Sequence, residues 1–391
     1  MKRPSTLVLL LAAIGCAARG YTAPVLAPLP WPADTLRTSV IADGVSTRYL
    51  YIPRGPWAVQ VLDVDLSRCT AAEALKGVSA APPGAIGRVK TTDLLRDLSR
   101  RAQVLGGVNA DFFSLAVPLG VPTGLLVANG TVLAGPGEQA VLAFDSAGAP
   151  SITTLHVSGT IVVGALTVPL ANWNRASRTG VAYFDAHYAS RSDTATGAIE
   201  VVLEGHDPAR VAAVDTLPSG VSIPTGGGVI VVGAAAPVGT RARFAALRVG
   251  DTMRVRAALM PFHPRDAVGG RPWLARAGIV NPAVDSGGPT SFNVGRNPRT
   301  AAGITDHGRR LILAVVDGRQ MPYSDGMSLR EVSTLMLALG ARDVINLDGG
   351  GSSTMVVSEP ATGALRIANR PSDKEGERAV GDALAIVRRC H

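Results

Sequence analysis

Short apolar runs fill residues 120–260, and each is ended by a residue that favours turns. This pattern constrains the possible fold class more than any other feature of the sequence. The runs are rich in Val, Ile and Leu, and Gly, Pro, Asn or Asp separates them. Examples are residues 124–127, 140–144, 160–163, 199–203 and 229–232. Such runs are typical of β-strands, and Asn129-Gly130 is typical of a hairpin turn. The chain is therefore predicted to be β-rich, which its 44 Gly and 27 Pro also favour.

Two segments have helical spacing instead. Residues 91–103 place four apolar side chains on one face of a predicted helix. Residues 328–339 begin with Ser328 and Glu331, a capping box in which each side chain bonds the other residue's backbone amide. Gly340 is placed to end this second helix.

Apolar runs at 311–316 and 344–347 flank the second predicted helix. A right-handed strand–helix–strand crossover would make these two strands parallel, so both should end at one edge of a sheet. The predicted fold class is α+β: a mixed, β-rich sheet core with few helices and a β-rich insertion at about 150–260.

The N-terminus has the pattern of a secretory signal. Lys2 and Arg3 precede an apolar stretch that ends in small residues. We expect a signal peptide at 1–18, a Pro-rich linker at 19–40 and one large domain at 41–391. Cys16 resembles the cysteine of a lipoprotein cleavage box, so a lipid anchor at Cys16 and ordinary cleavage near Ala18 are both open. No later segment reaches 18 uninterrupted apolar residues, so the mature protein is not expected to span a membrane.

The formal net charge of +8 does not predict a nucleic-acid partner, because the arginines are scattered and no run of five basic residues occurs. Attraction to anionic substrates or an anionic envelope is the alternative to a merely solvated surface. Cys69 and Cys390 are the two cysteines left beyond the signal segment. A bridge between them and two free thiols are both open. No zinc-type spacing of Cys or His occurs, so no structural zinc site is expected.

Polar residues follow several predicted strands. Asp348 precedes three glycines and two serines, a pattern that suits either an anion-binding turn or a plain tight turn. Asp317 is followed by Gly318 and Arg319, and the guanidinium of such an arginine can hold a phosphate. The segment 109–113 combines amide, carboxylate and two Phe rings, which suits a sugar site or simple core packing.

Five stretches in this order resemble the phosphodiester glycosidase family. They are Val-Asn-Ala-Asp-Phe-Phe (108–113), Asn-Pro-Arg-Thr-Ala-Ala-Gly-Ile (297–304), Ala-Val-Val-Asp-Gly-Arg (314–319), Gly-Met-Ser-Leu-Arg-Glu (326–331) and Ile-Asn-Leu-Asp-Gly-Gly-Gly-Ser-Ser-Thr (345–354). The segment 369–380 also resembles the ending of bacterial members. The resemblance covers about 109–385, and Asp111 departs from the Gly of animal members.

The resemblance implies an exported enzyme that hydrolyses the sugar C1–O bond of a glycosyl phosphodiester in envelope or extracellular glycans. We expect it in the periplasm, lipid-anchored or outside the cell, with no cofactor. Its oligomeric state is left open. The expected catalytic residues are Asp348 and Asp317 as carboxylates and Arg299 as a phosphate ligand. The expected substrate-binding residues are Asn109, Asp111, Phe112, Thr300, Arg319, Gly349, Gly350, Gly351 and Ser352.

Two other functions stay open from the sequence. One is a noncatalytic glycan-binding envelope protein that keeps the fold. The other is a metal-dependent phosphodiesterase in which Asp111, Asp317 and Asp348 would bind a hard divalent cation and P–O rather than C–O would break.

Overall fold

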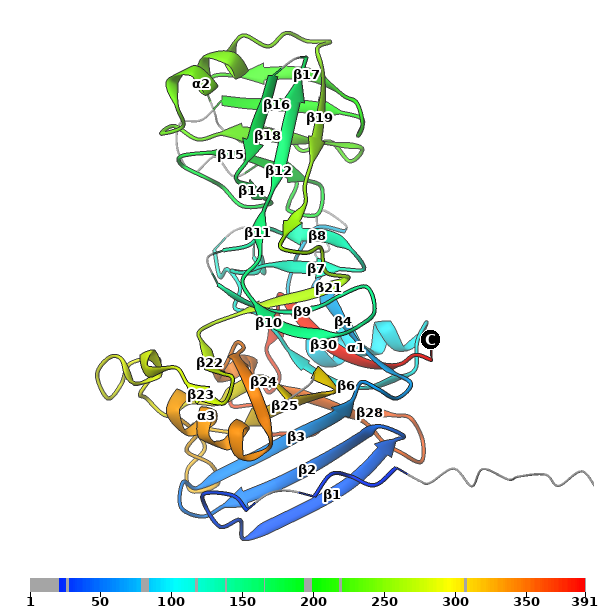
Figure 1. Ribbon diagram of the computed structural model, residues 1–391, viewed down its shortest axis with the longest axis vertical. Coiled ribbons are helices and arrows are strands. Elements are labelled where there is room, and N and C mark those ends of the chain that lie inside the picture. The colour runs from blue at the N-terminus through cyan, green and yellow to red at the C-terminus, as the bar shows by residue number, and fades with distance from the viewer. Residues whose placement is uncertain are drawn as a thin grey trace, which may run out of the picture.

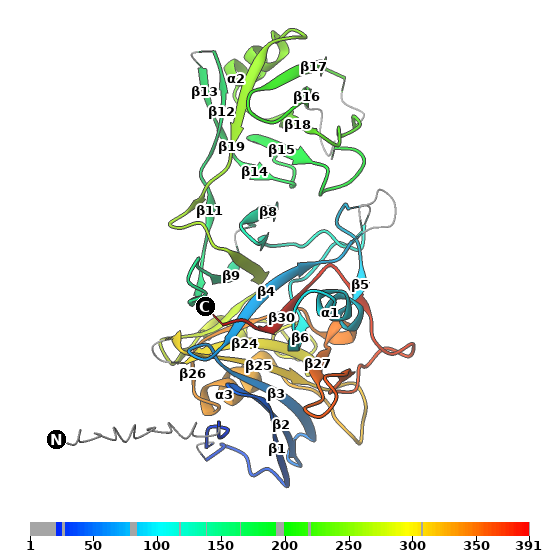
Figure 2. The ribbon, with the colours of Figure 1, turned by 90° about the vertical axis from the view of Figure 1, so that its right-hand side faces the viewer.

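The computed structural model describes residues 21–25, 28–78, 84–116, 119–137, 139–164, 166–192, 199–217, 220–305 and 308–390. The expected signal peptide and Cys16 lie outside these residues. The described chain forms an elongated molecule with a larger lower part and a smaller upper lobe (Figures 1 and 2). Sheets dominate both parts, and the prediction of a β-rich α+β fold is confirmed.

The sheet that positions the candidate site has eight strands in the order β1-β2-β3-β25-β24-β26-β22-β23. Their bounds are β1 Thr35–Ala42, β2 Val45–Ile52, β3 Trp57–Asp65, β22 Trp273–Arg276, β23 Ile279–Val280, β24 Arg299–Thr305, β25 Arg310–Val316 and β26 Ala341–Asn346. β24 lies between β25 and β26 and is antiparallel to both. β25 and β26 are therefore parallel and end at the same edge, as their sequence order predicts.

Helix α3 (Leu329–Ala338) covers one face of this sheet. It begins at the predicted capping box, with the Ser328 hydroxyl accepting from the Glu331 amide and the Glu331 carboxylate accepting from the Ser328 amide. Its buried residues pack with apolar side chains of β2, β3, β25 and β26. The helix thereby fixes the orientation of the strands whose ends carry the polar motifs.

A five-stranded sheet packs against the other face, in the order β28-β27-β6-β30-β4. Its strands are β4 Thr70–Lys76, β6 Val104–Asn109, β27 Met355–Ser358, β28 Leu365–Ile367 and β30 Asp382–Arg388. Helix α1 (Thr91–Ser99) packs on its outer side through Leu94, Leu95 and Leu98 (Figure 2). α1 ends earlier than the predicted residue 103, because the amides of Arg100 and Arg101 bond three residues back in a tighter turn.

A third sheet of five strands closes the core, in the order β10-β9-β21-β7-β8. Its strands are β7 Leu126–Ala128, β8 Thr131–Ala134, β9 Ala140–Phe144, β10 Pro150–Thr153 and β21 Asp266–Gly270. One apolar cluster joins all three sheets, with Leu62, Val108, Phe144, Leu313 and Leu384 among its buried members.

The upper lobe contains an eight-stranded sheet of its own, in the order β13-β12-β19-β17-β16-β18-β15-β14. The bounds are β12 Gly159–Val163, β13 Leu166–Leu170, β14 Asn172–Trp173, β15 Val181–Asp185, β16 Ile199–Glu204, β17 Ala209–Asp215, β18 Gly227–Val232 and β19 Thr252–Arg256. Helix α2 (Val238–Ala245) contributes Phe244 to a separate apolar cluster of this lobe. The ribbon of β11 (His156–Val157) and β20 (Leu259–Met260) connects the lobe to the rest. The lobe lies within the segment 150–260 expected as an insertion.

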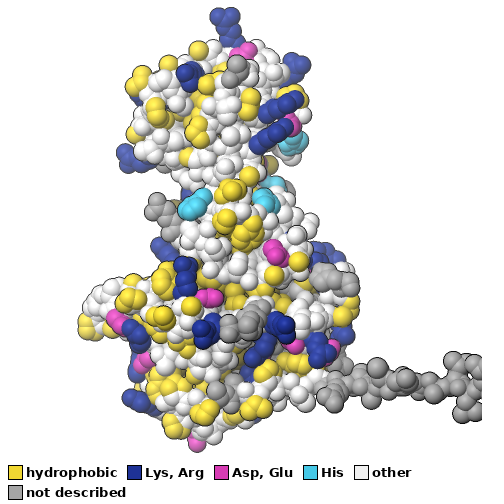
Figure 3. Space-filling view, in the orientation of Figure 1, with side chains coloured by type: hydrophobic (Ala, Val, Ile, Leu, Met, Phe, Trp, Pro, Cys, Tyr) yellow, Lys and Arg dark blue, Asp and Glu magenta, His cyan; other side chains and the backbone are white. Residues whose placement is uncertain are grey.

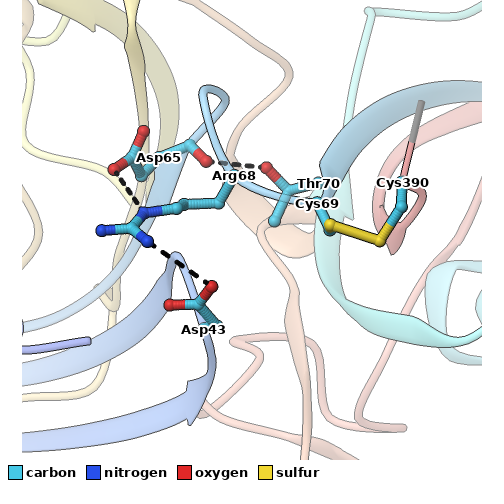
Figure 4. Close-up of a disulfide and its surroundings, with 6 residues drawn as sticks. All are labelled: Asp43, Asp65, Arg68, Cys69, Thr70 and Cys390. Carbon is cyan, nitrogen blue, oxygen red and sulfur yellow. Dashed lines mark hydrogen bonds and ion pairs between the residues drawn. A yellow bond between two sulfur atoms is a disulfide. The ribbon is translucent and has the colours of Figure 1, made fainter. Parts of the chain in front are cut away.

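Cys69 and Cys390 form a disulfide, with their Cα atoms 4.3 Å apart (Figure 4). Cys69 precedes β4 and Cys390 follows β30, and Thr70 pairs with Arg388 at the matching ends of these neighbouring strands. The bridge therefore joins adjacent strand ends that are far apart in sequence.

The surface shows no concentrated basic patch on the face seen in Figure 3, where Lys and Arg side chains are spread over both parts of the molecule. Within the described residues, none of the helices has both the length and the apolar character needed to cross a bilayer.

Candidate active site

The ends of β25 and β26 and the start of β24 bring the predicted polar residues to one edge of the eight-stranded sheet. Arg299 pairs with Val316, directly before Asp317, and Ala301 pairs with Asn346, two residues before Asp348. The topology therefore gathers Arg299, Asp317 and Asp348, which lie up to 49 residues apart in the sequence.

Asn109, at the end of β6, links the two packed sheets at this edge. Its Nδ2 donates to the Asp348 carbonyl oxygen at 2.7 Å. Its Oδ1 accepts from the Thr300 hydroxyl at 2.8 Å and from the Thr354 amide at 3.1 Å. Asn109 and Thr300 are both fully buried. Their side chains thus lie behind the site and support it.

Asp348 is half-buried and lines a pocket of about 290 Å³. Its Oδ1 accepts from the Gly349 amide at 2.9 Å, and its own amide donates to the Ala110 carbonyl at 2.8 Å. Burial raises the pKa of Asp348 to about 6, although the Ser352 hydroxyl, the Gly349 amide and two arginines favour the ionised form. The other residues that line the pocket are Phe292, Asn297, Arg299, Arg319, Gly349, Gly350 and Arg378.

The glycines after Asp348 let two arginine side chains approach the backbone. Gly350 has φ +63°, and a Cβ there would lie 3.3 Å from a guanidinium nitrogen of Arg319. A Cβ on Gly351 would lie 2.0 Å from the Asp373 carboxylate and 2.4 Å from the Arg378 guanidinium. Only glycine permits this packing at residue 351 without displacing the ion pair.

The backbone amides of this turn are mostly used inside the protein. Gly349 donates to Asp348, Gly350 donates to the Pro298 carbonyl at 2.9 Å, and the Ser352 amide donates to the Gly349 carbonyl at 3.3 Å. The turn therefore offers a phosphate less backbone donation than its three glycines suggest, and the positive charge of the pocket comes from its arginines.

Two of these arginines are fixed by polar partners. Arg319 donates from Nε and Nη2 to Asn297 Oδ1 at 3.2 and 2.8 Å. Arg378 forms a two-pronged ion pair with Asp373, at 2.8 and 3.0 Å. Because these partners hold them beside the glycine turn, the two guanidinium groups are oriented before any ligand binds.

Arg299 is almost fully buried and holds the loop that carries Phe292. Its Nε donates to the Met327 carbonyl at 2.9 Å, and one Nη donates to the carbonyls of Phe292 and Gly295 at 2.6 and 2.8 Å. Burial, with the nearby positive charge of Arg319, lowers the pKa of Arg299 to about 10. Arg299 thus combines a place in the pocket wall with a supporting role.

Asp317 is only 1% exposed, and donors surround its carboxylate. The Tyr323 hydroxyl and the Asn369 amide group each donate to it at 2.9 Å, and the Arg370 backbone amide lies 3.0 Å from both carboxylate oxygens. Burial raises the pKa of Asp317, and these donors oppose the rise. The structure therefore gives Asp317 a place behind the pocket, where it holds the 369–370 segment against the end of β25.

Asp111 is buried beneath the same edge. Its carboxylate accepts from the amides of Phe112 at 2.7 Å and Gly124 at 2.5 Å, and its own amide donates to Asp382 at 2.8 Å. A Cβ on Gly269 would lie 2.6 Å from Asp111 Oδ2. Burial raises the pKa of Asp111 to about 7, and burial beside Asp111 raises the pKa of Asp382 as well.

Phe112 lines a second depression of about 590 Å³ that adjoins the first, because Phe292 lines both. The two rings meet edge to face with centroids 5.7 Å apart, and the Arg271 guanidinium lies 4.9 Å from the Phe112 centroid. We refer to this depression as the aromatic cleft. An apolar ring surface beside a cation suits the face and hydroxyl groups of a sugar.

A hard cation does not suit the three aspartates proposed for it. Asp317 is saturated by protein donors, and Asp111 accepts two backbone amides. Within the described ranges, no group of three or more His, Cys, Asp or Glu side chains could hold a metal ion.

The lining residues that sequence reasoning did not identify include Arg271, Phe292, Asn297 and Arg378. Asn297 and Arg378 lie inside stretches that carry the family resemblance, so the resemblance could have indicated them as site residues. Arg271 and Phe292 lie outside those stretches, in connections without periodic pattern.

Known proteins resemble this chain in sequence and in fold. The model of the phosphodiester glycosidase family matches residues 197–387. No curated protein sequence matches the chain. A hypothetical protein from Synechocystis has a TM-score of 0.72 and 22% identity over 91% of this chain. This chain spans 64% of the Synechocystis protein, and the likeness concerns the fold.

Two further structures are similar. A candidate exported protein from Burkholderia pseudomallei K96243 has a TM-score of 0.65 and 26% identity, over 85% of this chain and 74% of that protein. The catalytic domain of zebrafish N-acetylglucosamine-1-phosphodiester alpha-N-acetylglucosaminidase, auto-inhibited by its pro-peptide, has a TM-score of 0.45 and 14% identity. That match covers 93% of this chain and 87% of the zebrafish domain.

Proposed function

Residues 197–387 belong to the phosphodiester glycosidase family, and on this premise we propose that the protein hydrolyses the bond between C1 of a sugar and a phosphodiester oxygen. The observation that carries the proposal is the pocket around Asp348. It combines a carboxylate of raised pKa with the guanidinium groups of Arg299, Arg319 and Arg378. A carboxylate for the sugar carbon and cations for the phosphate are the groups this reaction needs.

The chemistry divides between these groups. Cleavage at C1 passes through a state with oxocarbenium character, which a nearby carboxylate stabilises or attacks. The departing phosphate is a weak base, so it needs charge stabilisation more than a strong proton donor. We assign the sugar carbon to Asp348, as nucleophile or base, and the phosphate to Arg319 and Arg378.

The remaining predicted residues act through these groups. Asn109 and Thr300 fix the backbone of Asp348, and Asp317 fixes the 369–370 segment. Arg299 positions the Phe292 loop, while Phe112 contributes a wall for the sugar. Gly350 and Gly351 make room for the two arginines.

Hydrolysis in ¹⁸O-labelled water tests the proposal on 1-phosphodiesters of glucose, N-acetylglucosamine and mannose. Label on the sugar hydroxyl at C1 supports the glycosidase. Label on the phosphate would mean P–O cleavage and would overturn it in favour of a phosphodiesterase. No cleavage of any substrate would also overturn it and would favour noncatalytic glycan binding.

We also propose that the protein is exported. The Cys69–Cys390 disulfide supports this, because such bridges persist in oxidising compartments. The signal pattern at the N-terminus and the likeness to the Burkholderia protein agree with it. Mass spectrometry of the mature N-terminus distinguishes a lipid on Cys16 from plain cleavage near Ala18, and an intact residue 1 in the native host would contradict export.

A further inference from the structure

A third depression, of about 530 Å³, adjoins the pocket of Asp348 and shares no lining residue with the aromatic cleft. Arg378 lines both, just as Phe292 lines both the pocket and the cleft. The pocket of Asp348 therefore neighbours each of the other two hollows, in the order aromatic cleft, pocket of Asp348, third depression. We refer to the third as the basic cavity.

The walls of the basic cavity come from two short segments. β5 (Val89–Lys90) pairs with β29 (Ala379–Val380), so Lys90 stands opposite Ala379. The facing wall is the turn at residues 373–376, closed by a bond from the Gly376 amide to the Asp373 carbonyl at 2.9 Å. The cavity thus has a backbone framework and is not only a gap between mobile side chains.

The charges of the cavity do not cancel. Among its acids, Asp373 is paired with Arg378, and Glu377 accepts from the amide and hydroxyl of Thr92 at 2.8 and 2.7 Å. Glu375 is left as the single acid without such a bond in the described structure. Three exposed cations, Arg88, Lys90 and Lys374, have no ion pair among the described residues. Because the neutral donors of Thr92 leave the charge of Glu377 in place, the lining has four cations against three acids, a formal excess of one positive charge. An excess of unpaired cations beside a phosphate-binding pocket attracts a further anion.

The order of the hollows indicates which part of the substrate would carry this further anion. With the sugar ring against Phe112 and Phe292 and the scissile phosphate at Arg319 and Arg378, the leaving group continues past Arg378. We propose that the leaving group of the natural substrate carries a second anionic group, a phosphate or carboxylate, which binds Arg88, Lys90 and Lys374. This inference rests on the proposed function and names the substrate class of the same site: polyanionic glycosyl phosphodiesters.

The test compares matched substrates. Each of the three sugar 1-phosphates is made as a diester with glycerol, so that glycerol 1-phosphate leaves, and as a diester with glycerol 3-phosphate, so that glycerol 1,3-bisphosphate leaves. The parent protein is expected to show a kcat/KM at least about tenfold higher for the second form. The double variant Lys90→Ala/Lys374→Ala should lower that advantage by about tenfold through KM and leave kcat/KM for the glycerol diester unchanged, because two exposed ion pairs together have up to this size of effect. The advantage should also shrink at high salt.

The control is Arg243→Ala, which removes an exposed cation from α2 in the upper lobe and should change neither substrate. Thermal unfolding of each variant shows whether the fold is intact. Equal kcat/KM for the two forms, a preference unaffected by the double variant, or equal losses on both forms would each overturn the inference while leaving the glycosidase proposal standing. Failure of the parent to cleave any of the six substrates would overturn both.

Discussion

The pH dependence of kcat/KM tests the role given to Asp348. Burial raises the pKa of this carboxyl to about 6. If Asp348 acts as nucleophile or base, it must be ionised, so activity reaches a plateau above about pH 7, is half of it near pH 6, and falls about tenfold for each further pH unit well below 6. At pH 4 about 1% of the molecules carry the ionised group, and kcat/KM should be about a hundredfold below its plateau.

The same assay distinguishes a different role. A residue that donates a proton must be protonated, so an acid at Asp348 would give activity that falls above pH 6. A profile of that sign would refute the assignment of Asp348 as nucleophile or base while keeping the residue in the site.

The variant Asp348→Asn completes the test. It should lower kcat/KM by at least roughly 10²–10⁴-fold at every pH, on both phosphodiester and activated aryl glycoside substrates. The fold should persist, because the amide is nearly isosteric and its oxygen can still accept from Gly349. Asp343→Asn is the matched control, since Asp343 lies on β26 and bonds the Ala277 amide away from the pocket. Full activity in Asp348→Asn would sink the central assignment and would direct attention to Asp317 or Asp111.

Three further changes have defined outcomes. Arg299→Lys should lower the unfolding free energy measured in urea by about 2–4 kcal/mol, because an ammonium group cannot reproduce the buried hydrogen bonds of the guanidinium. It should also lower activity on both phosphodiester and aryl glycoside substrates. A loss confined to phosphodiesters would mean that Arg299 contacts the phosphate directly. Gly351→Ala should reduce kcat/KM with little change in melting temperature, because the new Cβ displaces the flexible Asp373 carboxylate and with it the partnered arginine; unchanged activity would contradict that. Replacing Cys69 and Cys390 by Ser should cost about 2–5 kcal/mol of stability, and equal denaturation midpoints with and without reductant would show that the bridge contributes nothing.

The sequence predicts those parts of the fold that depend on residues close together in the chain. The capping box at Ser328 and the two apolar runs beside it suffice to predict α3, the parallel strands β25 and β26, and a shared edge for Asp317 and Asp348. β24 and β25 are consecutive and form a local hairpin, but the pairing of β24 with β26 on its other side could not be predicted, because strands separated by a helix give no local signal of which neighbour they pair with.

The roles of the polar residues were harder to predict for a similar reason. Asp317 and Asp348 look alike in the sequence, since each follows a buried strand and precedes glycine. They differ in what the rest of the chain brings to them. Asn369 and Arg370, more than 50 residues later, occupy the carboxylate of Asp317, whereas that of Asp348 faces a pocket. The side chain of Asn109 is likewise occupied by hydrogen bonds with Thr300 and Asp348, about 190 and 240 residues away.

The position of β30 has a consequence for how the protein folds. β30 is the last strand in the chain, yet it lies inside its sheet between β6 and β4, whose paired residues are about 270 to 320 positions earlier. Contacts of such long range are slow to form, because the entropy of closing a large loop is lost before the contact is gained. Until β30 joins, β6 lacks a neighbour on one side, and the Asn109 amide at its end cannot be held in place to orient Asp348. The pocket should therefore assemble late, and the activity proposed for it should appear only together with the complete native fold.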